Sequence, residues 1–244
     1  TYWLSQPLRT EYNHRHSLYV EGGAESFRFG LGLNYDRQNG VMKKSYRERI
    51  GAELKVDYRL KNFQITDQVS FGRTNSQDSP YGSFYNYVQL NPYLPTHDLI
   101  TGELLKRFPD FADYALRNNP LYDATLSSFS QSDLRSYANN FSVNATFLEN
   151  FRLRFQFAIS YQDNDGERFV DPEAFRYESK PVEERGELFL SRSEQFGWNY
   201  NLLLMYNNRI KGNYMNFSLG LNAKEDKTKI SSSHLRGFPS GQFH

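Results

Sequence analysis

Few side chains in this sequence are arranged for chemistry. Two of the five histidines, His14 and His16, would share one face of a strand and could chelate a metal ion. No third ligand lies near them in the sequence, so a polar strand end is the favoured interpretation. The sequence has no cysteine, which excludes disulfides, thiolate metal sites and cysteine nucleophiles.

Three other short motifs lack residues that their chemistry requires. Asp163-Asn-Asp-Gly166 resembles the start of a calcium loop but has no closing Glu, so we expect a solvated turn there. The stretch 237–241 has the wrong spacing for the nucleophile turn of a hydrolase, and Gly30 and Gly32 are not followed by the helix of a dinucleotide site. We therefore predict no catalytic residue, no metal site, no cofactor and a protein that is not an enzyme.

One segment has the composition of a binding surface. Between residues 81 and 95, aromatic rings alternate with amides, and binding pockets combine apolar walls with a few polar groups. The candidate contacts to a sugar or a peptide backbone are Tyr81, Phe84, Tyr85, Tyr87, Asn91 and Tyr93. The alternative is that these aromatic side chains only pack the loop against its own sheet.

The elements that position these residues are predicted to be β-strands. Segments of about 10 residues alternate apolar and polar side chains, as a strand does when its two faces meet different surroundings. The alternation covers residues 27–36, 50–60, 63–71, 141–147, 151–161, 196–206 and 217–222, and a first strand near 16–21 brings the total to about eight. The polar faces of these strands are predicted to include Arg28, Asn34, Glu53, Lys55, Arg152 and Arg154.

The connections between these strands are alternately short and long. Short turns are expected at 22–26, 61–62, 149–150 and 207–212, and longer links at 37–45, about 72–136 and 162–190. Outer-membrane barrels have short periplasmic turns and longer extracellular loops, and a link as long as 72–136 is uncommon in a compact soluble domain. Tyrosines that suit a membrane interface lie near the predicted strand ends, at Tyr35, Tyr58, Tyr161 and Tyr206. The sequence thus predicts an all-β, antiparallel transmembrane β-barrel segment.

Composition excludes other classes. The net charge is only +1, which argues against a nucleic-acid-binding protein, and no apolar run is long enough for a transmembrane helix. The first residues are polar, so no secretory signal is expected, and the chain would be a mature product or an internal fragment. The alternative is a soluble or secreted β-barrel module of lipocalin type, whose apolar face points inward and which dissolves without detergent.

Several motifs, in order, resemble the SusC/RagA family of TonB-dependent transporters. They begin with His16-Ser-Leu-Tyr-Val-Glu-Gly-Gly23 and Asn39-Gly-Val-Met42, followed by Tyr46-Arg-Glu-Arg49. The similarity continues through Ser79-Pro-Tyr-Gly-Ser-Phe84, Leu90-Asn-Pro-Tyr93, Asn119-Pro-Leu-Tyr122, Asn139-Asn-Phe141 and Gly237-Phe-Pro-Ser240. The resemblance covers nearly the whole chain.

This resemblance implies a partial barrel over residues 1–244, because the family has a barrel of 22 strands with an N-terminal plug. No plug, TonB-contacting segment or barrel C-terminus is recognisable here. The implied function is import of oligosaccharides or peptides across the bacterial outer membrane. The implied partners are a SusD-like surface lipoprotein, TonB acting through the plug, the substrate and membrane lipid. The polar faces would line the lumen or contact the plug.

Overall fold

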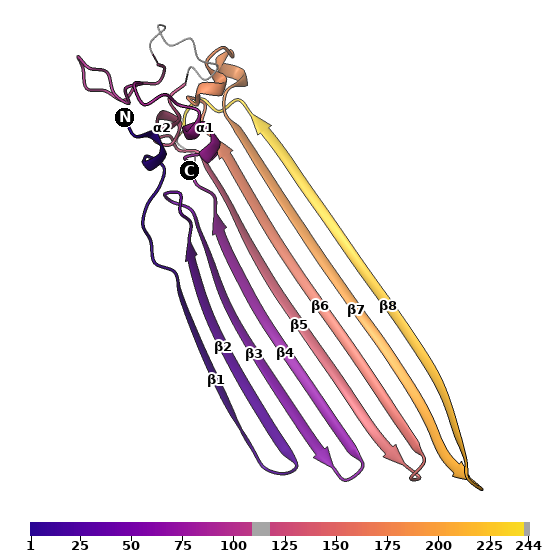
Figure 1. The fold of residues 1–244 in the computed structure, drawn as a ribbon. Helices are drawn as coiled ribbons and strands as arrows, with labels where there is room; N and C mark the ends of the chain where they lie inside the picture. Colours follow the sequence, from indigo (N-terminus) through magenta and orange to yellow (C-terminus); the bar gives the residue numbers. More distant parts are fainter. Residues whose placement is uncertain (109–117, 242–244) are drawn as a thin grey trace.

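The computed structural model, described for residues 1–108 and 118–241, contains one antiparallel sheet of eight strands in sequence order. Figure 1 shows the strands running side by side, with all long connections gathered at one end. The strands are β1 (His14–Gly23), β2 (Phe27–Asn39), β3 (Tyr46–Leu60), β4 (Phe63–Gln77), β5 (Phe129–Phe147), β6 (Phe151–Val170), β7 (Glu187–Ile210) and β8 (Asn213–Arg236). The predicted all-β antiparallel fold with eight strands is confirmed.

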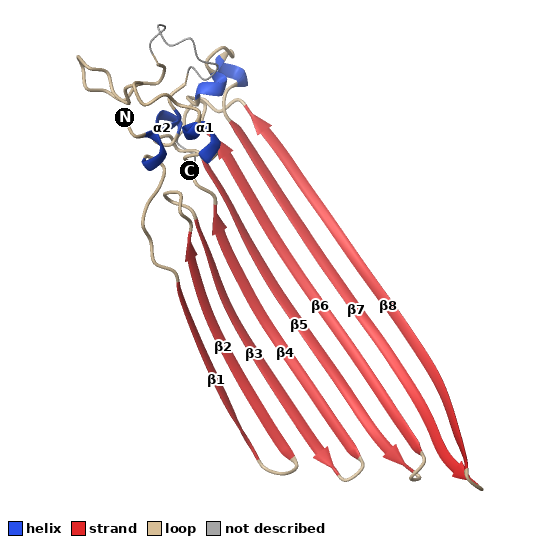
Figure 2. Ribbon diagram, in the orientation of Figure 1, coloured by secondary structure: helices blue, strands red, loops and turns tan. Residues whose placement is uncertain are grey.

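Among the described residues, short helices occur only before β1 and in the connections between strands (Figure 2). They are η1 (Trp3–Ser5), α1 (Phe84–Val88), α2 (Pro120–Asp123), η2 (Phe175–Tyr177) and η3 (Val182–Glu184). No helix in the described ranges has the length and apolar character needed to cross a membrane.

Tight turns connect the strands at the opposite end of the sheet, which we call the turn end. A two-residue hairpin needs positive φ angles, and Lys61 (φ 42°), Lys211 (φ 50°) and Gly212 (φ 86°) supply them. Gly23 (φ 142°) begins the β1–β2 turn, where a Cβ atom would lie only 2.1 Å from the carbonyl oxygen of Phe27. The other end, with the longer connections, is called the loop end.

The strands extend further toward the loop end than the sequence predicted. The link expected at 72–136 is shorter, at 78–128, because β4 continues to Gln77 and β5 begins at Phe129. The links expected at 37–45 and 162–190 are 40–45 and 171–186. Asp163 to Gly166, expected as a loop turn, lies inside β6, so that prediction is wrong.

Cross-strand ion pairs explain these longer strands. Beyond the last apolar residues, Arg73 Nε lies 2.8 Å from Asp133 Oδ1, and Arg192 Nε lies 3.2 Å from Asp163 Oδ1. Arg135 Nη2 lies 3.2 Å from Asp165 Oδ2. Backbone pairing therefore continues where charge pairs replace apolar pairs, a continuation that a search for apolar alternation does not detect.

The register sorts the side chains of all eight strands onto two faces. Phe29 is opposite Val56, and Leu54 is opposite both Leu31 and Val69, so apolar positions meet across neighbouring strands. We call this side the apolar face and the other the polar face. The main buried cluster among the described residues lies in the connections at the loop end and comprises Trp3, Tyr87, Leu90, Leu94 and Phe108.

Candidate functional site

The six predicted polar-face residues all lie on the polar face and are exposed. Gly30 is opposite Lys55 and Gly32 is opposite Glu53, which places both charges beside the glycines of β2. Arg28 and Asn34 lie on the same side of β2, whereas Arg152 and Arg154 lie near the turn end of β6. The six residues therefore form two groups that β4 and β5 separate.

An uncharged strip lies beside these groups on β4 to β7, and the sequence analysis did not identify it. Four segments have no charged side chain on the polar face: Gln64 to Ser76 of β4, Ser130 to Thr146 of β5, Gln156 to Gly166 of β6 and Ser191 to Met205 of β7. Reading the polar positions of these four strands together, rather than looking for charges, would have found this strip. We call this surface the uncharged strip.

A hollow of about 270 Å³ lies on the uncharged strip. It is bordered by hydroxyl and amide side chains of four strands: Thr66, Gln68, Asn140, Ser142, Gln156, Asn199 and Asn201. Within residues 1–108 and 118–241, the five amide side chains of this set have no hydrogen-bond partner. Each amide can both donate and accept, so the hollow suits a ligand with hydroxyl or peptide groups.

The structure divides the six loop residues proposed to contact a ligand. Tyr87 has 0% exposure, and burial raises the pKa of its hydroxyl well above the ordinary value. Tyr81 packs partly buried against the same cluster, so these two side chains stabilise the loop. This is the packing role that the sequence left open as the alternative.

The other four loop residues lie nearer the surface. Tyr93 is 93% exposed, Tyr85 is 63% exposed and Phe84 is 38% exposed. The Asn91 side chain accepts a hydrogen bond from the backbone N–H of Tyr93 at 2.9 Å, which orders the turn that presents the ring. Tyr85 and Tyr93 are therefore the aromatic side chains best placed to meet a ligand.

Hydrogen bonds join the connections at the loop end into one assembly, which we call the cap. Asp171 accepts hydrogen bonds from the backbone N–H groups of Ser127 (3.1 Å) and Glu173 (2.9 Å). Asp123 accepts one from the N–H of Phe175 at 3.0 Å, and burial raises the pKa of this carboxyl group. The cap is thus fixed by one buried and one half-buried carboxylate, which accept hydrogen bonds from backbone N–H groups of different segments.

The first residues of the chain also belong to the cap. Arg9 donates a hydrogen bond to the carbonyl oxygen of Ser45 at 2.9 Å, and Leu8 pairs with Met42 in an isolated bridge. Trp3 is buried and its ring contacts Phe108 edge-on, with centroids 5.5 Å apart. These contacts link the segment before β1 to the β2–β3 and β4–β5 connections.

The apolar face has the dimensions of a membrane surface. On β3 the apolar positions extend from Ile50 to Leu60, which is about 33 Å along the strand. With the strand tilt usual in outer-membrane barrels, this length gives a band roughly 23–27 Å tall. One polar pair interrupts the band: the Asn139 amide donates to Asp67 Oδ1 at 2.6 Å.

His14 and His16, the pair that could chelate a metal ion, lie on the same face of β1. The rings of His14 and His16 lie 5.6 Å apart and beside Tyr35, at the loop-end edge of the apolar face. Within the described ranges, no group of three or more histidine, aspartate or glutamate side chains is arranged to hold a metal ion.

Three features define the class of protein: an open antiparallel wall with an apolar band on one face, tight turns at one end, and long connections at the other. The chain has the fold of part of an outer-membrane transporter barrel. Comparison with solved structures gives particular neighbours. The RagAB peptide transporter matches with a TM-score of 0.77 and 16% identity, over 98% of this chain and 27% of that one. A RagAB peptide importer in an open-open state matches with a TM-score of 0.67 and 12% identity, over 95% of this chain and 29% of that one.

A second kind of neighbour shares the fold. The ferripyoverdine receptor of the Pseudomonas aeruginosa outer membrane matches with a TM-score of 0.54 and 14% identity, over 90% of this chain and 27% of that one. No family model and no curated protein matches the chain. The predicted SusC/RagA likeness is confirmed at the level of fold, and the chain spans about a quarter of the length of these neighbours.

Proposed function

We propose that this chain is part of the barrel of a TonB-dependent importer of oligosaccharides or peptides in the bacterial outer membrane. The apolar face meets lipid, the polar face lines the lumen or contacts a plug, and the cap lies outside the cell. The order of short turns and long connections supports this orientation, because periplasmic turns are short in such barrels.

The uncharged strip is the observation on which the proposal depends. It crosses four strands and ends below the cap, so a ligand released from the cap would next meet amides and hydroxyls. Side chains that both donate and accept suit the hydroxyl groups of a glycan and the amides of a peptide alike. Phe84, Tyr85, Asn91 and Tyr93 then supply the first contacts at the cap.

The proposed partners follow from the resemblance and from the transporter neighbours. A SusD-like lipoprotein would cover the cap, and TonB would act through the plug domain of the full-length protein. The lipocalin-type alternative receives no support from the described residues, because β1 pairs only with β2, β8 pairs only with β7, and large apolar side chains remain exposed on one face.

Uptake by the full-length protein tests the proposal. A strain that lacks the gene should lose growth on either a peptide mixture or an oligosaccharide mixture as sole carbon source, and the wild-type gene should restore it. Asn199→Arg, in the uncharged strip, should assemble normally but restore growth poorly. Ser231→Arg adds the same charge on the other face near the loop end and should restore growth fully. Growth on both mixtures without the gene would refute the proposal.

A further inference from the structure

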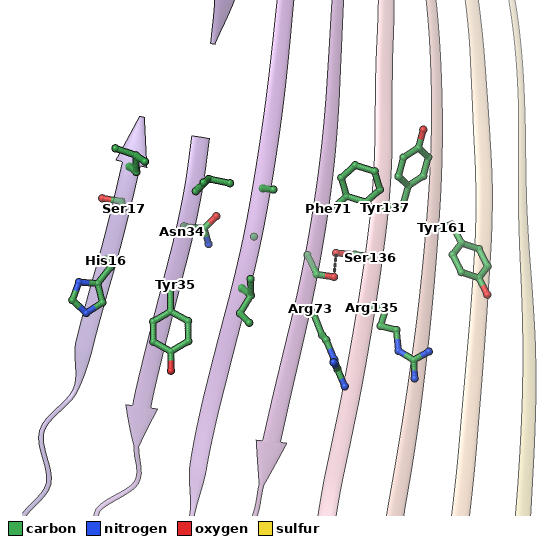
Figure 3. A pocket seen from close by; sticks show the side chains of 16 residues that line it. His16, Ser17, Asn34, Tyr35, Phe71, Arg73, Arg135, Ser136, Tyr137 and Tyr161 are labelled. Carbon is green, nitrogen blue, oxygen red and sulfur yellow. Dashed lines mark hydrogen bonds between the residues drawn. The ribbon is translucent and has the colours of Figure 1, made fainter. Parts of the chain in front are cut away.

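A groove of about 730 Å³ lies on the apolar face, near the loop-end edge of the apolar band. It extends across the sheet from β1 to β6, as Figure 3 shows. Its floor is low at Ala52, because this small side chain lies between Leu33 on β2 and Phe71 on β4. Larger apolar side chains form its walls: Leu18, Leu33, Ile50, Phe71 and Tyr137.

Two arginines form one end of this groove. Arg73 and Arg135 lie opposite each other on β4 and β5 and follow directly after the apolar positions, on the loop-end side of Phe71 and Tyr137. Among the described residues that line the groove, these are the only charged side chains apart from His16, which is charged only when protonated. No carboxylate is part of the groove lining.

Carboxylates on the far side hold the two guanidinium groups in place. Arg73 uses Nε and Nη2 to bind Asp133, and Arg135 uses Nε for Asp133 and Nη2 for Asp165. Asp163 lies 3.9 Å from Arg135 Nη1. Within the described ranges, Arg73 Nη1 has no hydrogen-bond partner, so it can donate to an anion that approaches from the groove.

The height of the groove matches the boundary between acyl chains and headgroups. On β4 the apolar-face positions from Phe63 to Phe71 extend about 27 Å along the strand, or roughly 19–22 Å of membrane depth at the usual tilt. Arg73 is the next residue on that face. The groove therefore lies at the depth of acyl chains, and the arginines lie at the level of the headgroups.

We propose that this groove binds a phosphate-bearing glycolipid of the outer leaflet. One acyl chain lies along Ala52, and a phosphate group accepts hydrogen bonds from Arg73 and Arg135. The argument for a glycolipid rests on the membrane orientation proposed above, because the outer leaflet of a bacterial outer membrane is built from phosphorylated glycolipid. It does not depend on which substrate is imported.

Native mass spectrometry of the full-length protein in detergent tests the site, with diphosphoryl lipid A as the probe and phosphatidylglycerol as the comparison. The wild-type protein should bind lipid A preferentially. Arg73→Gln/Arg135→Gln should weaken lipid A binding roughly tenfold or more, since two charge-assisted hydrogen bonds are lost. Ala52→Phe should weaken it as well, because the new ring fills the floor of the groove while both arginines remain.

Arg209→Gln/Lys211→Gln is the matched control, because it removes two positive charges at the turn end and should leave lipid A binding unchanged. Heat-modifiable gel migration confirms that every variant is folded. Lipid A binding that is equal in the wild type and in both groove variants would overturn the site. Preferential binding of phosphatidylglycerol would overturn the glycolipid assignment. Loss of nutrient uptake with normal lipid binding, or the reverse, separates this inference from the proposed function.

Discussion

Phe155 and Gln156 are neighbours on β6 whose side chains lie on opposite faces, so they test which face meets lipid. Phe155 is the third of six alternating apolar residues between Phe151 and Tyr161, which places it near the middle of the band. Gln156 borders the hollow of the uncharged strip and is exposed. Replacing each with arginine in the full-length protein adds the same charge at nearly the same depth.

The expected effects differ by several kcal/mol. An arginine that faces lipid near the bilayer midplane costs about 2–4 kcal/mol. Phe155→Arg also removes ring contacts with Tyr200, at 5.4 Å between centroids, and with Phe141, at 6.1 Å. Each such pair contributes about 0.5–1.5 kcal/mol beyond its buried area. Gln156→Arg loses no hydrogen bond within the described ranges and places its charge on a polar, solvated face.

Barrel assembly can be measured by heat-modifiable gel migration, and stability by denaturant titration of the folded band in lipid vesicles. Phe155→Arg should reduce the folded fraction strongly, and Gln156→Arg should leave it within experimental error of the wild type. Equal loss of assembly in both variants would refute the face assignment. A greater loss for Gln156→Arg would mean that the apolar face is the inner one.

Three further predictions concern single contacts. Asn139→Leu should lower the free energy of unfolding in lipid by about 1–3 kcal/mol, because Asp67 loses its hydrogen-bond donor inside the apolar band. The double variant Asp67→Leu/Asn139→Leu should restore this free energy. Denaturant titration in lipid vesicles measures both variants. The Asp98 carboxylate accepts hydrogen bonds from two backbone N–H groups, and these lower its pKa from the ordinary 3.8. It therefore stabilises its turn above that pH and loses this effect as the pH falls through the lowered pKa. Hydrogen exchange of the turn, normalised to an unstructured peptide, should rise in acid for the wild type but not for Asp98→Asn. Gly186→Ala should destabilise the cap by about 1–3 kcal/mol, because φ is +74° there and the new Cβ would lie 2.9 Å from Phe238 Cβ. Faster proteolysis of residues 171–186 in the variant would reveal this destabilisation.

The apolar alternation was sufficient to predict the strands that cross the band, because one face of each strand is uniformly apolar there. Residues 50–60 and 151–161 correspond closely to parts of β3 and β6. The same signal disappears toward the loop end, where both faces are polar. The ends of β6 and of β8, which continues to Arg236, were therefore missed.

For a similar reason, the sequence predicted only part of the candidate site. Alternation identifies the face of Glu53 or Arg154, because a strand fixes side-chain direction at every second residue. It cannot tell whether a loop aromatic side chain is exposed, since that depends on contacts between distant segments. Tyr87 is buried because Trp3 and Phe108 come to it from elsewhere in the chain, whereas Tyr93 has no such cover and stays exposed.

The strands thus meet different surroundings along their length. Near the turn end, one face is apolar and the other polar, because the membrane covers only the apolar face. Near the loop end, ion pairs such as Arg73 with Asp133 support the backbone ladder, and Asp123 and Asp171 join the segments of the cap to one another. Because the cap is joined to strands that leave the membrane together, its hydrogen-bonded segments should behave as one body. Changes on ligand binding should then be concentrated at exposed tips such as Tyr93, which the cap presents but does not cover.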